Sequence, residues 1–490
     1  MIDRRQLLKL GAFAGASALV PAERLAGVFR GQPSVAPEVP KFAVPLTVPP
    51  ELRPRRLPER LDYYDVTMKE ATAEILPGLK TPVWTYNGSF PGPTIRARAG
   101  RPVVVRQRNL LPEEAAVHLH GGNVPSGSDG MPGDEIPRNG SRYYFYPNAQ
   151  PAATLWYHDH IHHQEAVRTY RGLAGLYLIS DKAEDALGLP HGPYDVPLVI
   201  QDRFFNADGS FRLPGPGEFA GDVTLVNGRP HPVLEVERRP YRFRLLNASS
   251  FDGLLALSLS NGDAVQVIAG DGGLLPAPVP VRSVPLAPAE RVEVVIDFSR
   301  YPIGTQIVLR NSLTIFGTAP EVMRFDVTRP ASSGYHPLPA KLVPVRRLKE
   351  SSARVRREFT LNLDPVTGKM VINGKEFDPE RVDIEPRLGD TEIWTIVNAE
   401  KPALPIPHVF HTHLVRFQIL DRNGQPPEPI EAGWKDSVNI EAGGWVRIIM
   451  KFGDFPGRYL YHCHLLGHAD LGMMGQMNVR RRRHAKGRLS

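Results

Sequence analysis

Residues 459–473 read Tyr-Leu-Tyr-His-Cys-His-Leu-Leu-Gly-His-Ala-Asp-Leu-Gly-Met and contain Cys463, the only cysteine of the chain. A histidine flanks Cys463 on each side, another follows five residues later, and Met473 follows ten residues later. The aromatic residues before Cys463 predict a β-strand. Because side chains alternate along a strand, Cys463 is expected to point to one face, and His462 and His464 to the opposite face.

One thiolate, two imidazoles and a distant axial thioether form a blue-copper electron-transfer site. Cys463, His468 and Met473 supply three of these four groups, and the remaining imidazole must come from another segment. On the opposite face, His462 and His464 can hold a second metal centre beside the first. The alternative is a buried structural cysteine among incidental histidines. Three histidines and a methionine at suitable offsets argue against that alternative.

The composition favours several β-rich domains. The chain has 490 residues with 49 prolines and 44 glycines, and short apolar alternations such as Arg291–Asp297 are separated by turn dipeptides such as Asn227-Gly228. A chain of this length predicts two to four domains. Outside the N-terminus there is no apolar run of about 18 residues, so no membrane span is expected.

The N-terminus has the features of an export signal. Arg4 and Arg5 precede an apolar stretch over residues 10–21, and small residues follow it. This pattern predicts a twin-arginine (Tat) signal peptide over residues 1–26, with the Tat export machinery as a partner and a periplasmic, extracellular or cell-envelope location. The alternative is a basic arm beside a short helix. A single cysteine permits no intrachain disulfide, even in an oxidising compartment.

The net charge of +7 and the isoelectric point near 9.4 reflect the signal and the C-terminal run over residues 480–488. Such a run is most often a solvated tail. No basic motif interleaved with aromatic residues occurs, so nucleic acid is not an expected partner.

Proline-rich stretches and turn signals divide the chain into successive segments. The middle segment carries strand signals but little chemistry, so its expected task is spacing and interface formation. The predicted segments are a signal (1–26), a proline-rich arm (27–57), a first domain (58–192), a second domain (193–335), a linker (336–352), a third domain (353–480) and a basic tail (481–490).

Ten of the 16 histidines fall in four clusters. Two are His-x-His pairs that follow apolar runs, so each pair projects two imidazoles to one face of a strand. If two histidines serve the blue-copper site, eight remain, which is enough for three further copper ions with open positions for oxygen. The clusters are His118 and His120; His158 and His160; His408, His411 and His413; and His462, His464 and His468.

The other histidines are given no ligand role. His162 and His163 follow the second pair out of register, and they are interpreted as solvated or as neighbours of the ligands. His191, His231, His336 and His484 have no histidine companions and are treated as incidental.

These clusters resemble the multicopper oxidase family, which includes laccases, bilirubin oxidases and bacterial cuprous oxidases. The motifs His-x-His-Gly, His-x-His, His-x-x-His-x-His and His-Cys-His-x-x-x-His-x-x-x-x-Met are intact between about residues 60 and 480. The resemblance implies an all-β protein of three consecutive cupredoxin-like Greek-key β-barrel domains. It also implies four copper ions, one of type 1, one of type 2 and a type-3 pair.

The resemblance assigns ligands by position. It implies that the trinuclear centre lies between the first and last domains. The type-1 ligands would be His408, Cys463, His468 and Met473; the type-2 ligands His118 and His411; and the type-3 ligands His120, His158, His160, His413, His462 and His464.

Two carboxylates are implied as proton-relay residues. Asp129 matches the acidic residue that feeds protons to the trinuclear site, with a turn-forming role before Gly130 as the alternative. Many bacterial members have an acidic residue where this chain has Ala469, which leaves Asp470 as the nearby carboxylate.

Other departures bear on the substrate. Ile406 stands where bilirubin oxidases have tryptophan, which disfavours bilirubin. Met370 is the only methionine between residues 351 and 449, so the methionine-rich insert of cuprous oxidases is not visible. Val409 replaces a usual proline, with little expected consequence.

The implied activity is one-electron oxidation of phenols or aromatic amines near His408, coupled through Cys463 to reduction of O2 to water. A metallo-oxidase that acts on Cu(I) in copper tolerance is the alternative within the family. A copper-free envelope scaffold on the same fold is the alternative from another class.

Overall fold

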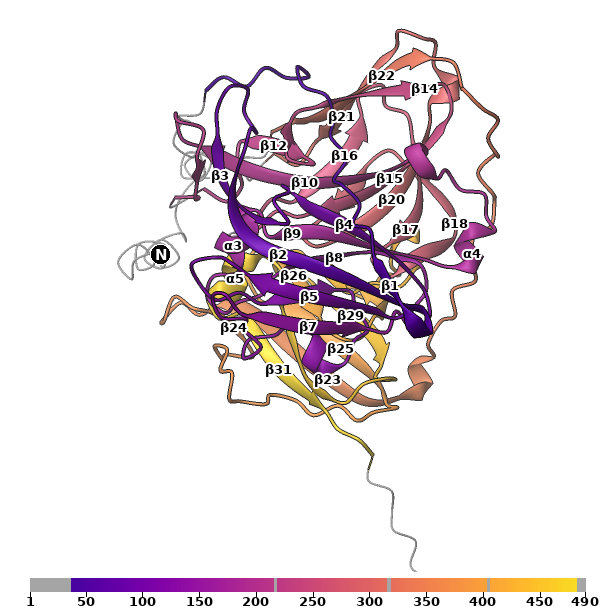
Figure 1. Cartoon of the computed structure of the whole chain (residues 1–490). Helices are drawn as coiled ribbons and strands as arrows, with labels where there is room; N and C mark the ends of the chain where they lie inside the picture. The colour runs from indigo at the N-terminus through magenta and orange to yellow at the C-terminus, as the bar shows by residue number, and fades with distance from the viewer. Residues whose placement is uncertain (1–36, 216–217, 315–318, 403–405, 483–490) are drawn as a thin grey trace, which may run out of the picture.

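The structure is a computed structural model that describes residues 37–482 apart from 216–217, 315–318 and 403–405. The described chain forms three consecutive two-sheet β units (Figure 1). These units are cupredoxin-like, so the predicted all-β fold with three consecutive barrels is confirmed. The expected signal segment, residues 1–26, lies outside the described residues, as do residues 483–490 of the expected basic tail.

The first unit carries two of the histidine pairs. Its elements are β1 (Arg55–Leu57), η2 (Pro58–Arg60), β2 (Leu61–Ala73), β3 (Thr81–Tyr86), β4 (Gly92–Arg98), β5 (Val103–Asn109), β6 (Val117–His120), η3 (Ser126–Ser128), β7 (Ser141–Tyr146), β8 (Ala153–Asp159), α3 (Glu165–Arg171), β9 (Ala174–Ser180) and α4 (Lys182–Asp185). One sheet has the order β1-β2-β5-β7, with β3 on β2, and the other has the order β4-β9-β8-β6. In β5, Val103 and Val105 are buried whereas Arg108 is exposed, as alternation requires.

The second unit is the largest pair of sheets. Its elements are η4 (Gly192–Tyr194), β10 (Asp195–Phe205), β11 (Phe211–Arg212), β12 (Val223–Val226), β13 (Arg229–Pro230), β14 (Val233–Glu237), β15 (Pro240–Asn247), β16 (Leu255–Leu259), β17 (Val265–Gly270), β18 (Gly273–Val281), β19 (Val284–Leu286), β20 (Arg291–Asp297), η5 (Phe298–Arg300), β21 (Gln306–Asn311) and β22 (Glu321–Arg329). The sheet β13-β12-β10-β15-β20-β17-β18, with β11 on β10, packs on β14-β22-β21-β16-β19 around Phe243, Leu257 and Phe325.

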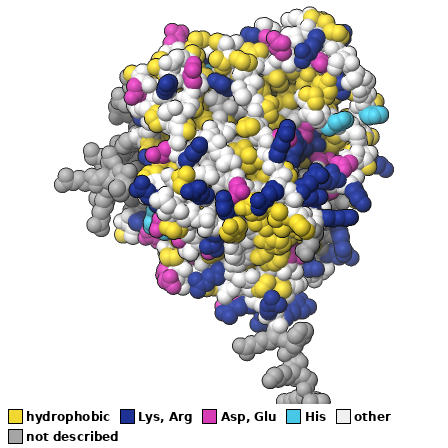
Figure 2. All heavy atoms as spheres, in the orientation of Figure 1, with side chains coloured by type: hydrophobic (Ala, Val, Ile, Leu, Met, Phe, Trp, Pro, Cys, Tyr) yellow, Lys and Arg dark blue, Asp and Glu magenta, His cyan; other side chains and the backbone are white. Residues whose placement is uncertain are grey.

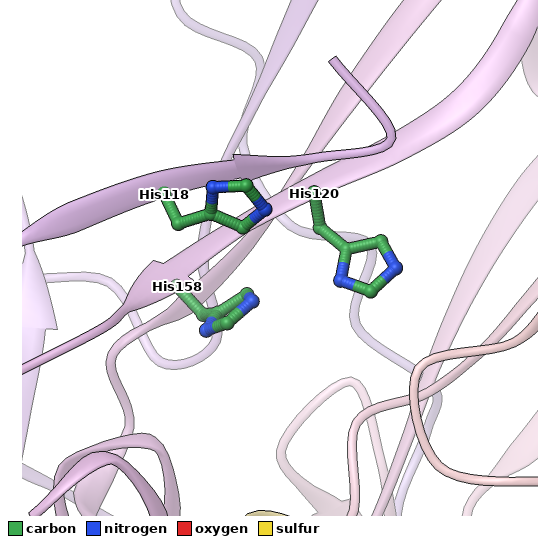
Figure 3. Close-up of side chains that lie close together, drawn as sticks. All are labelled: His118, His120 and His158. Atoms are coloured by element: carbon green, nitrogen blue, oxygen red, sulfur yellow. The ribbon is translucent and has the colours of Figure 1, made fainter. Parts of the chain in front are cut away.

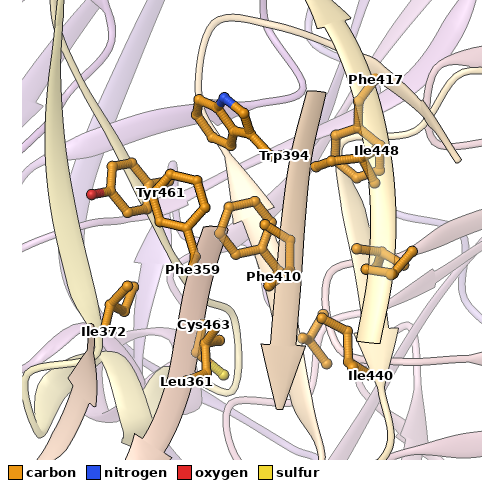
Figure 4. Packing of buried hydrophobic residues seen from close by; sticks show 14 of the residues in the cluster. Phe359, Leu361, Ile372, Trp394, Phe410, Phe417, Ile440, Ile448, Tyr461 and Cys463 are labelled. Atoms are coloured by element: carbon orange, nitrogen blue, oxygen red, sulfur yellow. The ribbon is translucent and has the colours of Figure 1, made fainter. Parts of the chain in front are cut away.

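The third unit carries the cysteine stretch. Its elements are η6 (Glu350–Ser352), β23 (Ala353–Leu363), β24 (Met370–Ile372), β25 (Thr391–Asn398), β26 (His408–Thr412), β27 (Phe417–Arg422), η7 (Pro429–Glu431), β28 (Ser437–Ile440), β29 (Trp445–Lys451), β30 (Gly457–Cys463), α5 (Leu466–Asp470) and β31 (Met474–Val479). The sheets are β24-β23-β25-β29-β27 and β28-β26-β30-β31. Their shared core contains Phe359, Trp394, Phe410 and Tyr461 beside Cys463 (Figure 4). The thiol therefore lies inside a rigid aromatic core.

The described part of the proline-rich arm packs on both of the first two units. The backbone N–H of Leu46 donates to the carbonyl of Val233 at 2.8 Å, and that of Leu52 donates to the carbonyl of Thr94 at 2.9 Å. The arm ends in β1, which pairs with β2, so the first sheet already begins within the segment expected to be an arm.

The segment over residues 336–352 runs along the second and third units. The N–H of Leu342 donates to the carbonyl of Pro276 at 2.9 Å, and that of Leu348 donates to Oε1 of Gln418 at 2.8 Å. The segment therefore forms hydrogen bonds with both units and is more than a covalent link between them.

In Figure 1 the second unit (magenta to salmon) lies above the third (orange to yellow), and the first unit contacts both. Thr154 of the first unit donates to Glu293 of the second at 2.7 Å. Little histidine is visible on the face drawn in Figure 2, and the ten clustered histidines are buried. Among the described residues, no helix has the length and apolar character needed to cross a membrane.

Candidate metal centre

The two histidine pairs of the first unit lie side by side on neighbouring strands. β6 and β8 are antiparallel, and the register places His118 directly opposite His158. The rings of His118, His120 and His158 face a common space (Figure 3), and one ring nitrogen of each lies within 4.8 Å of the others. His160 follows the end of β8 and is also fully buried.

The third unit presents its histidines from a matching pair of strands. β26 and β30 are antiparallel, with His411 opposite His462 and Phe410 opposite Cys463. His413 follows β26 and His464 follows β30, and both are buried. As alternation predicts, Cys463 packs in the aromatic core while its two histidine neighbours leave that core.

The two units meet ring against ring. His118 stacks on His413 with ring centroids 3.8 Å apart, and His120 stacks on His411 at 3.7 Å. The Nε2 atom of His462 lies 3.4 Å from Nε2 of His160 and 3.3 Å from Nε2 of His413. Residues some 300 positions apart therefore form one cluster, as the family resemblance implies.

These contacts leave buried ring nitrogens without a hydrogen bond. Nδ1 of His118 and Nδ1 of His411 each pair with a backbone carbonyl, of Asp129 at 2.7 Å and of Asp436 at 2.8 Å. Their Nε2 atoms are buried and have no partner among the described residues. Nε2 of His158 and both ring nitrogens of His464 are also buried without a hydrogen-bond partner among the described residues. An unpaired buried polar atom costs about 1–3 kcal/mol, so a cluster of them fits metal coordination.

The protonation state of the rings suits that interpretation. Burial lowers the pKa of His158 to about 3 and that of His462 to about 4. Burial also lowers the pKa of His120, His413 and His464 well below the ordinary value. The imidazoles are therefore neutral at pH 7, which is the form that binds metal ions.

The thiol group forms a separate set on the other side of β30. Sγ of Cys463 lies 3.7 Å from Nδ1 of His408 and 3.7 Å from Nδ1 of His468. The backbone carbonyl of Met473 accepts the N–H of Cys463 at 3.1 Å. The side chain of Met473 is fully buried in the same core. Burial raises the pKa of Cys463 to about 12, so a thiolate there requires a bound cation. His408 supplies the remaining imidazole of this set. The sequence could not locate that imidazole without the family pattern.

The outer edges of these two imidazoles face carboxylates. Nε2 of His408 lies 3.6 Å from Oε1 of Glu400, and Nε2 of His468 lies 3.8 Å from Oδ1 of Asp252. His408 is fully buried, whereas 11% of the His468 side chain is exposed. Of the two imidazoles, the one that reaches the surface is therefore His468, whose ring centroid lies 5.2 Å from that of His408. Asp252 comes from the second unit, whose loops could not be placed from the sequence.

Asp129 lies where a proton-relay residue is expected. It is fully buried, and its Oδ2 lies 2.7 Å from Nδ1 of His413. Burial raises its pKa well above the ordinary carboxyl value. Asp129 also precedes the turn at Gly130, where a Cβ would lie 1.9 Å from the carbonyl oxygen of Val117.

Asp470 has a different task from the one expected. Its two oxygens accept the backbone N–H groups of Glu165 at 2.9 Å and Ala166 at 3.0 Å, so it closes the start of α3 from the third unit. The structure shows no contact of its carboxylate with a clustered histidine among the described residues. Burial raises its pKa to about 7.

Glu165 is the carboxylate that sequence reasoning missed. Its oxygens lie 3.4 Å from Nδ1 of His158 and 3.6 Å from Nδ1 of His160, and neither oxygen has a hydrogen bond within the described chain. It is fully buried, which raises its pKa well above the ordinary value. The only signal was its position five residues after His160, at the start of a short helix.

Asp436 is a second missed residue. Its Oδ1 lies 3.0 Å from Nε2 of His120, and Ser437 Oγ lies 3.1 Å from the same nitrogen. The unpaired ring nitrogen of His120 is therefore Nδ1, whereas His118, His158 and His411 leave Nε2 unpaired. Of the histidines outside the clusters, His162 is half-buried, and His163 is exposed and contacts the carbonyl of Asp470.

Several known proteins are similar to this chain. Residues 67–184 and residues 348–483 each match a family model described as multicopper oxidase. A laccase from Bacillus subtilis (strain 168) is 37% identical over 514 residues, covering 90% of this chain and 98% of the laccase. Cell division protein FtsP from Escherichia coli (strain K12) is 34% identical, covering 98% of this chain and 99% of that protein.

A solved structure shows the same fold. The laccase from Pediococcus acidilactici Pa5930 superposes with a TM-score of 0.82 at 32% identity, covering 91% of this chain and 95% of that laccase.

Proposed function

The chain belongs to the multicopper oxidase family, and from this premise we propose that it oxidises phenols or aromatic amines and reduces O2 to water. Family membership supports copper binding and an oxidoreductase activity that uses O2. The observation that carries the proposal is the meeting of buried, unpaired imidazoles from both ends of the chain beside the Cys463 thiol. Four one-electron oxidations and four protons balance the conversion of one O2 to two waters.

The proposed ligand sets follow the family pattern and the observed groups. Asp436 is not assigned as a ligand, because both of its oxygens already accept hydrogen bonds. Type-1 copper would bind His408, Cys463, His468 and Met473; type-2 copper His118 and His411; and the type-3 pair His120, His158, His160, His413, His462 and His464.

When bound, the copper ions supply one-electron redox chemistry and the site at which O2 is reduced. Cys463 and its chain neighbours His462 and His464 connect the two ligand groups through a few covalent bonds, because alternation sends them to opposite faces. The ligand side chains are buried, which excludes bulk water from the cluster. Asp129 holds a proton between its Oδ2 and Nδ1 of His413, at the edge of the cluster.

The carboxylates at the outer edge of the thiol site favour an organic reductant over Cu(I). Asp252 Oδ1 lies beside the partly exposed His468 ring, and it is buried without a hydrogen-bond partner among the described residues. A carboxylate can accept the proton that a phenol loses on oxidation. Cu(I) prefers thioether and thiolate ligands, which these oxygens do not supply.

A steady-state comparison separates the two substrate classes. At equal copper loading, a diphenol is expected to show the higher kcat/KM and Cu(I) the lower. The Asp252→Asn variant should raise the KM for the diphenol while the blue absorption stays unchanged. Faster turnover of Cu(I), with no effect of Asp252→Asn on the diphenol, would favour the metallo-oxidase.

The copper-free scaffold has support from the similarity to a cell division protein. The complete set of histidines together with Cys463 favours the oxidase instead. Metal analysis of the chain after copper reconstitution distinguishes them, because a scaffold would retain no copper.

We also propose that the chain is exported by the Tat machinery to the periplasm or cell envelope, on the basis of Arg4 and Arg5. Replacing both arginines by lysine should leave the chain in the cytoplasmic fraction. Unchanged export of that variant would reject the proposal.

A further inference from the structure

Arg291 is the first residue of β20, and it reaches from the middle unit toward the histidine cluster. It is completely buried. A guanidinium has five N–H donors, and each one here meets an oxygen. Nε donates to the carbonyl of Thr154 at 2.9 Å, Nη1 to the carbonyl of Ala289 at 2.9 Å, and Nη2 to the carbonyl of Asp271 at 3.1 Å.

The two remaining donors form a bidentate pair with Asp436 of the third unit. Nη1 lies 2.8 Å from Oδ1 and Nη2 lies 2.5 Å from Oδ2. Since Thr154 belongs to β8, Arg291 joins all three units at one point. The planar fork of arginine fixes the plane of a carboxylate, which a single point charge does not do.

The carboxylate fixed in this way contacts His120. Asp436 Oδ1 lies 3.0 Å from Nε2 of His120, and Ser437 Oγ bridges the same two atoms at 3.0 Å and 3.1 Å. A carboxylate accepts, so Nε2 is the nitrogen that carries hydrogen, and Nδ1 keeps its lone pair. Nδ1 of His120 is indeed the buried nitrogen without a partner.

Two neighbouring rings of the cluster use the opposite arrangement. His118 and His411 bind a backbone carbonyl through Nδ1 and leave Nε2 unpaired. Backbone carbonyls are fixed by the strands themselves, whereas the partner of His120 is a side chain that needs support. Arg291 provides that support.

Gly121 provides the space for the pair. A Cβ at this position would lie 2.7 Å from Oδ2 of Asp436 and 2.9 Å from Nη2 of Arg291, and its φ of +80° is in the left-handed region. The glycine of the His-x-His-Gly motif is therefore required by the ion pair that passes beside it.

We infer that Arg291 is a positioning residue of the copper cluster, which acts through Asp436 to present Nδ1 of His120 to the type-3 pair. The middle unit thus contributes to the oxygen-reducing site although it supplies none of the proposed ligands. This inference rests on the proposed copper function.

The test compares Arg291→Met with wild type after the same copper reconstitution of the intact chain. Removal of a group that orients a metal ligand typically lowers metal affinity by about 10–100-fold. We expect that loss at the trinuclear cluster, measured as copper per chain and as the electron paramagnetic resonance of type-2 copper. The blue absorption of the Cys463 site should remain, because Arg291 touches none of its ligands. Arg291→Lys should restore part of the copper, since lysine can reach only one carboxylate oxygen at a time.

Arg244→Met is the matched control. Arg244 is also a buried arginine of the middle unit, pairs with Asp195 at 2.7 Å and Glu293 at 3.0 Å, and donates to Oγ1 of Thr154 at 3.0 Å. It has no described hydrogen bond to a clustered histidine. Its loss removes a comparable buried ion pair without altering His120, so it should lower stability and leave copper per folded chain unchanged.

The outcomes separate the inference from the proposed function. Wild-type chain that binds no copper would reject the proposed function itself. If the wild-type chain binds copper, a wild-type copper content in Arg291→Met would overturn the inference. Loss of the blue absorption and of the cluster signals to the same extent in Arg291→Met and Arg244→Met would also overturn it. If Arg291→Met does not fold, Asp436→Asn decides, because the amide nitrogen that replaces Oδ2 cannot accept from Nη2 of Arg291, so the bidentate pair is lost. Wild-type copper content in that variant would likewise overturn the inference.

Discussion

Replacing Gly121 by alanine changes a single methyl group next to the Arg291–Asp436 pair. The added Cβ would lie 2.7 Å from Asp436 Oδ2 and 2.9 Å from Arg291 Nη2. Neither atom can yield freely, because Arg291 is held by three backbone carbonyls and Asp436 by Ser437 and His120. The clash must therefore break at least one charge-assisted hydrogen bond.

Two terms contribute to the cost. Holding alanine at a left-handed φ costs about 1–2 kcal/mol, and losing one charge-assisted hydrogen bond costs about 1.5–3 kcal/mol. Gly100→Ala isolates the first term, since Gly100 has a similar φ of +73° and a Cβ there would meet no atom within 4 Å. We expect Gly121→Ala to be less stable than Gly100→Ala by about 1.5–3 kcal/mol.

The assay is urea unfolding of the two intact variants at the same copper loading, together with copper per chain. Gly121→Ala should also lose copper from the trinuclear cluster while it keeps the blue absorption, whereas Gly100→Ala should keep both. Equal unfolding free energies and equal copper content for the two variants would refute the packing argument.

Three further predictions test separate parts of the structure. Cys463→Ser should abolish the blue absorption and O2 reduction, and persistence of either would reject the thiolate assignment. Asp470→Ala should lower the free energy of unfolding by about 1–3 kcal/mol, because two N–H groups at the start of α3 lose their acceptor; an unchanged free energy would show that the cap contributes nothing. Burial would raise the pKa of Asp195, but Arg244 and Arg242 outweigh it and hold the pKa below 3.8. Asp195→Asn should therefore be less stable by about 3–5 kcal/mol at pH 7. That difference should shrink only as the pH falls through the lowered pKa of Asp195; a gap that is constant with pH would contradict this linkage.

The faces to which the clustered histidines point could be predicted from the sequence because that information is local. Strand alternation places His462 and His464 opposite Cys463, and each His-x-His pair projects to one face. The family pattern then connects the segments. Both features are present in short motifs, so no tertiary contact had to be guessed.

The residues around the ligands depend on contacts between distant segments. Asp470 and Glu165 are 305 positions apart, so the cap that Asp470 provides could not be read from its place after His468. Likewise, the carboxylates beside His408 and His468, which are Glu400 and Asp252, come from separate loops. Arg291 looked like an ordinary strand residue, since nothing in its local sequence marks a partner in another unit.

The most direct test of the copper proposal is the number of copper ions per chain after anaerobic reconstitution and removal of unbound metal. The proposal predicts four ions, with blue absorption and an electron paramagnetic resonance signal from a second, non-blue copper. A chain that retains no copper, or a single blue copper alone, would contradict the shared cluster between the first and third units.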